Sequence, residues 1–115
     1  MASTFKNAGK LINQLDHTVN DIYTVPSGAQ SVIHALFVTN HSDTTNAQVD
    51  VKATIDGGTT FIHIGKNLTV PAQNTLTIDK PINMEQNDKL RVIVRENQDS
   101  SVPNIEAFAS ILEVS

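Results

Sequence analysis

Histidine is the first residue type in this chain to consider for chemistry, because cysteine is absent. Without cysteine there is no thiolate nucleophile, thiolate metal ligand or disulfide. The four histidines are His17, His34, His41 and His63. His34 and His63 lie in predicted strands that could be neighbours, but a catalytic zinc needs three protein ligands and a structural zinc needs four. Because no H-x-H or H-E-x-x-H spacing adds ligands, ordinary strand or loop histidines are favoured over a small metal protein, and we expect no metal and no cofactor.

Carboxylates could provide acid–base catalysis if two of them faced a substrate. The closest pairs in the sequence are Glu85 with Asp88 and Glu96 with Asp99. All four lie in polar stretches, where a solvated acid is the usual state. No serine-nucleophile motif or phosphate-binding glycine loop is present either. We therefore predict no catalytic residues and a protein that is not an enzyme.

The amino-acid composition of the chain argues against several classes of ligand. The chain has 115 residues, which is the size of one domain, and a formal net charge of −4 from eight basic and twelve acidic residues. A nucleic-acid binder usually carries a basic face, so we expect no nucleic-acid partner. Tryptophan is absent and Tyr23 is the one tyrosine, which leaves few rings for stacking on sugars or bases. No stretch is apolar and long enough for a membrane span or a signal peptide.

Alternation of apolar and polar residues predicts strands that would have to position any functional side chain. In AQVDVKATI, residues 47–55, apolar side chains recur at every second position up to Ile55, and Asp56-Gly57-Gly58 then predicts a hairpin turn. KLRVIVRE, residues 89–96, alternates in the same way. NIEAFASILEV, residues 104–114, has some helical propensity, but its period of two favours a strand.

One predicted strand, SVIHALFVTN at residues 31–40, is apolar on both faces. Strict alternation would place Val32, Leu36 and Val38 on one face. The opposite face would then carry Ile33, Ala35 and Phe37. A strand of this type is expected in the centre of a sheet, covered on one side by the core and on the other by a neighbour or a partner chain.

Two stretches share the pattern Val-Pro followed by a small polar bend, namely TVPSGAQSV at 24–32 and TVPAQNTL at 69–76. Proline removes a ladder hydrogen-bond donor, so Pro26 and Pro71 are expected where strands end. PINMEQNDKL, residues 81–90, has the same role with Asn87-Asp88. We interpret these stretches as three corners built in a similar way, rather than as a repeated functional loop.

Short strands separated by such corners predict an all-β fold, a single antiparallel β-sandwich that is jelly-roll-like or Ig-like. Residues 1–16 lack a clean helix signal and are predicted to form an extended N-terminal arm or edge strand, and residues 17–115 form the β-sandwich domain.

The layout of the chain resembles small structural proteins of tailed-bacteriophage virions, such as those of phages that infect cyanobacteria. The stretches that carry the resemblance are MASTFKNAG, IYTVPSGAQSVIHALFVTN, IHIGKNLTVPAQNTLTI, KPINMEQNDKLRV and EAFASILEVS. They share a Y-x-x-P corner, a strand that ends in Asn, a K-N-x-x-V-P corner and a D-x-L motif. The usual Gly-Asp is replaced by Asn87-Asp88, and asparagine also tolerates a left-handed backbone.

This resemblance implies a non-enzymatic virion protein that is assembled in the host cytoplasm, most directly a capsid decoration (cement) protein. A neck, collar or tail accessory protein is the first alternative, and a carbohydrate-binding β-sandwich module is a further one. The implied partners are the major capsid protein or neck and tail proteins, with homo-oligomerisation, possibly as a trimer, and no membrane. Contacts are predicted in the arm and in the two-faced strand, at Phe5, Leu11, Ile12, Leu15, Ile33 and Phe37.

Overall fold

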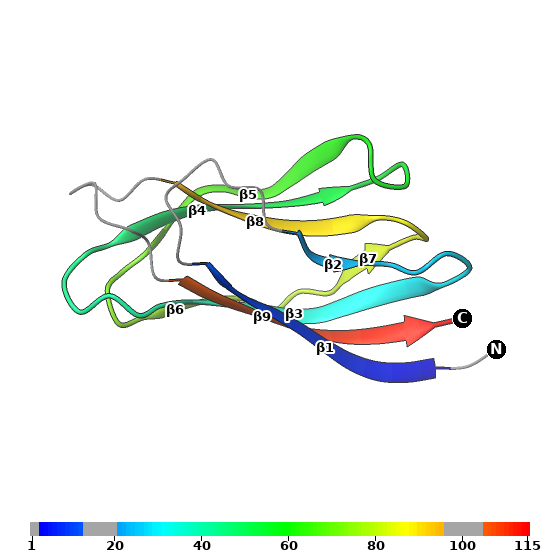
Figure 1. The fold of residues 1–115 in the computed structure, drawn as a ribbon, viewed down its shortest axis with the longest axis horizontal. Helices are drawn as coiled ribbons and strands as arrows, with labels where there is room; N and C mark the ends of the chain where they lie inside the picture. The colour runs from blue at the N-terminus through cyan, green and yellow to red at the C-terminus, as the bar shows by residue number, and fades with distance from the viewer. Residues whose placement is uncertain (1–2, 13–20, 96–104) are drawn as a thin grey trace.

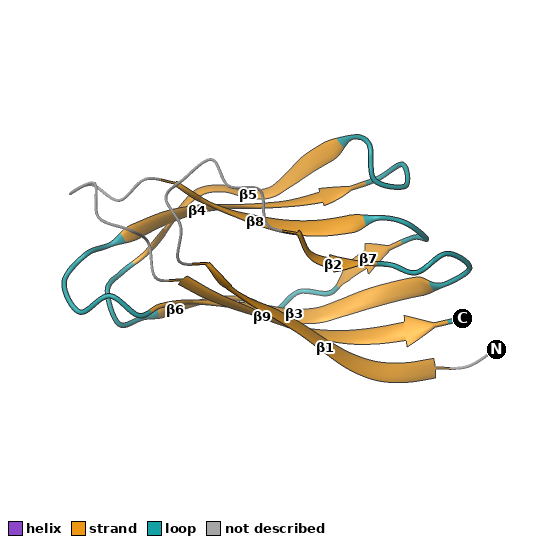
Figure 2. Cartoon of the chain, viewed as in Figure 1, coloured by secondary structure: helices purple, strands orange, loops and turns teal. Residues whose placement is uncertain are grey.

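The computed structural model describes residues 3–12, 21–95 and 105–115, and these residues form strands and connecting loops without a helix (Figure 2). No segment of the described chain is therefore a helix that could cross a membrane. The nine strands in this part of the chain are β1 (Ser3–Ile12), β2 (Asp21–Thr24), β3 (Gln30–Asn40), β4 (Ala47–Thr54), β5 (Phe61–Val70), β6 (Thr75–Ile78), β7 (Ile82–Met84), β8 (Lys89–Arg95) and β9 (Ile105–Val114).

The strands form two antiparallel sheets that pack face to face as a β-sandwich (Figure 1). Sheet A has the order β1-β9-β3-β6, and β7 pairs with the same edge of β3 as β6 does. Sheet B has the order β2-β8-β4-β5. The predicted fold class is thus confirmed, and the N-terminal segment forms the edge strand β1, which pairs with β9 over ten residues.

The core between the sheets is built by the alternation that the sequence predicts. Inward positions of β9 are buried at Ile105, Ala107, Ala109 and Ile111, which confirms a strand rather than a helix. β8 buries Leu90, Val92 and Val94 in the same manner. In β4 the pattern ends one residue earlier than predicted, because the strand stops at Thr54 and Ile55 is 63% exposed in the turn.

A β-bulge in β3 corrects the predicted assignment of its faces. Ile33 pairs with Ile111 and Ala35 pairs with Ser110, so His34 is an extra residue without a partner on β9. One extra residue moves every side chain beyond it to the opposite face. Ile33 therefore faces the core together with Leu36 and Val38, and the outer face keeps Val32 and Phe37. The strict alternation expected for this strand was wrong at this residue.

The three corners share one backbone solution, as predicted. In each, a backbone N–H donates to the carbonyl oxygen three residues earlier: Ala29 to Pro26, Asn74 to Pro71, and Asp88 to Glu85, all at 3.1 Å. The third residue of each corner has a positive φ, which is 83° at Gly28, 63° at Gln73 and 66° at Asn87. This left-handed residue is what reverses the chain within four residues. The shared motif thus has a structural role.

Candidate protein-contact surface

The outer face of sheet A gathers apolar side chains from strands that are far apart in the sequence. Antiparallel pairing places Phe5, Leu112, Val32 and Asn83 side by side across four strands, a row that we call the Phe5 row. A second row, the Phe108 row, contains Gly9, Phe108, Phe37 and Thr77. The two rows are separated by the smaller side chains of Asn7, Ser110 and Ala35.

We call the apolar part of this surface the contact face, and its members are Phe5, Leu11, Val32, Phe37, Phe108 and Leu112. Phe5 is 83% exposed, Leu11 57% and Phe108 47%. The rings of Phe37 and Phe108 lie 6.4 Å apart, centroid to centroid, and are tilted by 45°. No strand of the described chain covers this side of sheet A (Figure 1). A cluster of exposed apolar side chains on one face marks an interaction surface.

The contact face carries almost no charge. Among the described residues that pair at outward positions of sheet A, Glu106 is the one acidic side chain, and His41 Nε2 contacts its carboxylate; the exposed His34 lies at the bulge, and Glu85 lies beside β7 at the hollow described below. The other outward positions are apolar, glycine or uncharged polar residues such as Asn7 and Thr39. A surface of this composition is inexpensive to desolvate, since few charges have to lose water.

The outer face of sheet B is polar by contrast. Arg91 Nε donates to Asp21 Oδ1 at 2.8 Å, and the Arg91 guanidinium lies 3.8 Å from the centre of the Phe61 ring. Next to this pair, His63 Nε2 is 4.0 Å from Asp50 Oδ2. The ion pairs keep this face hydrated, and the Arg91 guanidinium covers the Phe61 ring. Sheet A is therefore the better candidate for a dry protein–protein contact.

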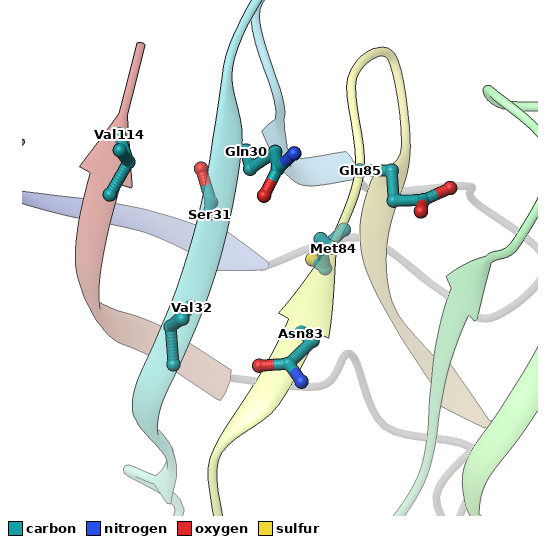
Figure 3. A pocket seen from close by; sticks show the side chains of 7 residues that line it. All are labelled: Gln30, Ser31, Val32, Asn83, Met84, Glu85 and Val114. Carbon is teal, nitrogen blue, oxygen red and sulfur yellow. The ribbon is translucent and has the colours of Figure 1, made fainter. Parts of the chain in front are cut away.

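A hollow of about 360 Å³ lies at one end of the contact face. Its lining comes from β3, from β7 with the following Glu85, and from the end of β9, as Figure 3 shows. Val32, Asn83 and Val114 belong to the outward positions of sheet A, so the hollow opens beside the Phe5 row. The hollow combines apolar side chains with amide and hydroxyl groups, and Glu85 is its one carboxylate, so it suits a protruding uncharged side chain better than an anionic ligand.

A polar cluster joins the two sheets at the edge formed by β1 and β2. The Tyr23 hydroxyl donates to Glu113 Oε2 at 2.6 Å and lies 2.7 Å from Ser31 Oγ, and Lys6 Nζ is 3.0 Å from Glu113 Oε1. Burial, and then the bond to Glu113, raises the pKa of Tyr23 to about 12. The same bond, followed by that from Lys6, holds the pKa of Glu113 below its usual value. The cluster stabilises the sandwich, and it occupies the tyrosine hydroxyl that a sugar-binding site would use.

The residues predicted as contacts divide into three groups. Phe5, Leu11 and Phe37 come together on the contact face. Ile12 and Ile33 are buried in the core, where they are inaccessible to a partner. Leu15 lies outside the described residues.

Phe108 and Leu112 lie outside the segments predicted as contacts, and Val32 lies in the predicted contact strand but was not singled out. The alternation in residues 105–114 could have indicated Phe108 and Leu112, because both occupy the positions between the apolar residues of the core. Only the strand pairing places them next to Phe5 and Phe37.

A metal site on His34 and His63 is not supported by their positions. His34 lies on β3 in sheet A, and His63 lies on β5 in sheet B, so they are not on neighbouring strands. Within residues 3–12, 21–95 and 105–115, no group of three or more histidine or carboxylate side chains could hold a metal ion.

Comparison with known proteins finds likenesses in structure alone. No protein-family model matches the chain, and no curated protein matches it in sequence. A chain in the "acidic stable capsid structure of Helicobacter pylori bacteriophage KHP30" matches with a TM-score of 0.53 and 17% identity, covering 100% of this chain and 89% of that one. A chain of infectious bursal disease virus, Gx strain, matches with a TM-score of 0.57 and 9% identity. That match includes 99% of this chain but 33% of the viral chain. At these identities the likeness is one of fold.

Proposed function

We propose that this chain is a structural protein of a bacteriophage virion, and specifically a capsid decoration (cement) protein. The observation that carries the proposal is the exposed, nearly uncharged contact face on a sandwich whose fold spans nearly the whole of a similarly sized chain in a phage capsid structure. Such a protein acts by binding, and its location is the virion, after assembly in the host cytoplasm.

The mechanism is repeated attachment on a symmetric lattice. Burying the ring of Phe5 alone contributes about 2 kcal/mol of binding free energy, which is weak for one molecule in solution. Copies that also bind one another on the shell gain avidity, because each bound neighbour raises the local concentration of the next. The partners under this proposal are the major capsid protein and further copies of the chain.

A neck or tail accessory protein would use the same kind of surface, and copy number separates the two roles. The test is quantitative mass spectrometry of purified particles of the phage that encodes the chain, with the major capsid protein as internal standard. We expect hundreds of copies per particle, in proportion to the capsid protein. A copy number of about a dozen would move the protein to the neck or tail, and its absence from particles would contradict a virion role.

A carbohydrate-binding module is a weaker alternative for this structure. The Tyr23 hydroxyl already bonds to Glu113 and Ser31, and its ring is only partly exposed. The exposed phenylalanines lack the polar groups that orient a sugar beside a ring. Specific hits on a glycan array would restore this alternative.

A further inference from the structure

We infer that the contact face binds a second copy of this chain, so that two sandwiches pack sheet A against sheet A about a twofold axis parallel to the strands. The inference deepens the proposed function by assigning the contact face to a second copy of the chain, so that a capsid protein would be bound through the other surfaces of the pair, and it rests on that function only in treating the contact face as an interface. A face-to-face pair of this kind is a dimer, whereas a trimer would require two different surfaces on each copy.

The distribution of charge favours this face for contact with a second copy. Two molecules that each carry a net charge of −4 repel one another through most of their surfaces. The contact face avoids this repulsion, because its members are apolar, the nearby Glu106 is contacted by His41, and Glu85 is the one carboxylate of the adjoining hollow. The nearest other titratable group on β3 is the exposed His34 at the bulge. Contact through this face therefore brings few like charges together.

The Phe5 row and the Phe108 row are self-complementary about a twofold axis. A twofold axis that runs along the strands between β9 and β3 exchanges β9 with β3 and keeps each row opposite the same row of the partner. Phe108 of one copy then faces Phe37 of the other, and Leu112 faces Val32. Stacked sheets lie about 10 Å apart with their strands nearly aligned, which is the distance that two layers of such side chains fill.

The Phe5 ring of one copy and the hollow of the other are complementary across the same axis. The same axis exchanges β1 with β7, so Phe5 of one copy lies opposite Asn83 of the other, at the hollow of about 360 Å³. An 83% exposed phenylalanine is a large apolar group without cover in the described chain. Insertion of each Phe5 into the hollow of the partner buries both rings at once, because an isologous contact is reciprocal.

The area of sheet A and the lysines on the free edge of β1 favour face-to-face packing over pairing of edge strands. Strands about 4.8 Å apart and ten residues long give sheet A roughly 600 Å² of flat area, near the roughly 800 Å² per partner of a stable interface. The free edge of β1 instead carries Lys6 and Lys10 at inward positions of the register. Inward-pointing lysines on an edge strand oppose pairing with another edge.

The test measures self-association of the purified full chain by sedimentation velocity and equilibrium at pH 7 from 1 to 300 µM. We expect the 12.5 kDa chain to form a dimer of twice that mass. Phe5→Asp and Phe108→Asp should each raise the dimer dissociation constant by about 30-fold or more, as is usual when an aromatic anchor that fills a pocket or the centre of an interface is lost. Ile55→Asp is the matched control, since Ile55 is exposed in the β4–β5 turn and should leave the constant unchanged.

A rescue variant tests the geometry of the dimer. Within one copy, residues 5 and 83 are separated by three strand spacings, which is about 14 Å, but in the dimer they face each other. Adding Asn83→Lys to Phe5→Asp should therefore recover at least about fivefold of the lost affinity, since the two new charges attract across the interface. Adding Lys52→Glu on sheet B instead should recover nothing.

A chain that stays monomeric at 300 µM would overturn the inference, as would a dimer that survives both phenylalanine variants or fails with Ile55→Asp. Circular dichroism of each variant shows whether it is folded, and Phe5→Ser repeats the test without a new charge. These measurements use no particles, so a dimer combined with absence from virions would reject the proposed function alone. A monomer that decorates capsids would reject only this inference.

Discussion

At the scale of single residues, Asp88 connects three parts of the chain. Its Oδ1 accepts hydrogen bonds from Thr54 Oγ1 at 3.1 Å and from the Gly57 N–H at 2.8 Å, and its Oδ2 accepts from the Glu85 N–H at 2.9 Å. Thr54 Oγ1 in turn accepts from the Lys89 N–H. The buried carboxylate thus fixes its own corner and holds it against the β4–β5 turn.

We predict that Asp88→Ala lowers the free energy of unfolding by about 3 kcal/mol, because two backbone N–H groups and one hydroxyl lose a charged acceptor. Asp88→Asn should cost less, since one acceptor oxygen remains. The measurement is urea unfolding followed by circular dichroism. Asp79→Ala, on an exposed loop residue, should change stability by less than about 0.5 kcal/mol. Equal losses of stability in Asp88→Ala and Asp79→Ala would contradict the structural role of Asp88.

The cluster of Tyr23 and Glu113 gives the sandwich a defined pH dependence. The pKa of Glu113 is lower in the folded protein, so its contribution to stability is present above the ordinary carboxyl pKa and is lost as the pH falls through the folded value. The pKa of Tyr23 is raised from 10.0 to about 12, so its contribution is present below pH 10 and is lost between pH 10 and 12.

We predict that Tyr23→Phe costs about 1 kcal/mol of stability at pH 7 and flattens the pH dependence in both windows. Urea unfolding of the wild type and the variant at pH 3, 7 and 11 measures the difference. Most of the gap between the two proteins should be present at pH 7 and should shrink at pH 3 and pH 11. A gap that stays constant with pH would show that the hydroxyl does not couple to Glu113.

At the scale of elements, the bulge in β3 decides which side chains reach the contact face. Ile33 and Ala35 keep consecutive partners on β9 although His34 lies between them. His34 can therefore be removed without shifting the register on either side. The bulge is a local addition to an otherwise regular ladder.

We predict that deletion of His34 leaves a folded protein, with a loss of about 2 kcal/mol or less. Deletion of Ser110, which pairs with Ala35 next to the bulge, should abolish folding, because half of β9 would turn its core residues outward and the cost would exceed a typical stability of about 5–15 kcal/mol. Circular dichroism and two-dimensional NMR spectra distinguish the two outcomes. A folded Ser110 deletion would contradict the register described here.

Some features of the strands and turns could be predicted from the sequence, and the bulge could not. The hairpin at Gly57 and Gly58, the strand character of residues 105–114 and the three corners follow from side-chain period and backbone preference, which are local properties. The extra residue at His34 carries no such signal, because a histidine in an apolar run fits a regular strand as well as a bulged one. Ile33 was accordingly predicted on the wrong face.

At the scale of the whole molecule, the two outer faces differ in character. Sheet B carries the Asp21–Arg91 pair, whereas sheet A presents the contact face. Such asymmetry is expected of a domain that is hydrated on one side and covered on the other. If a second copy covers sheet A, stability should depend on protein concentration.

We predict that the apparent Tm rises by about 3 °C for each tenfold increase in protein concentration above the dimer dissociation constant, because association stabilises the folded state by mass action. Scanning calorimetry from 5 to 500 µM measures this shift. The Phe5→Asp variant should show no dependence over the same range. A wild-type Tm that is independent of concentration would argue against self-association.

The sequence alone determined the class of fold, the inward side chains of β4, β8 and β9, and the places where the chain turns. These depend on the alternation of side chains along a strand and on the backbone preferences of proline, glycine and asparagine. The tertiary structure decided which outward side chains meet. Phe5, Phe37 and Phe108 lie in three separate segments, and only the pairing of β1 with β9 and of β9 with β3 places them on one surface, because register between distant strands is set by packing of the whole core.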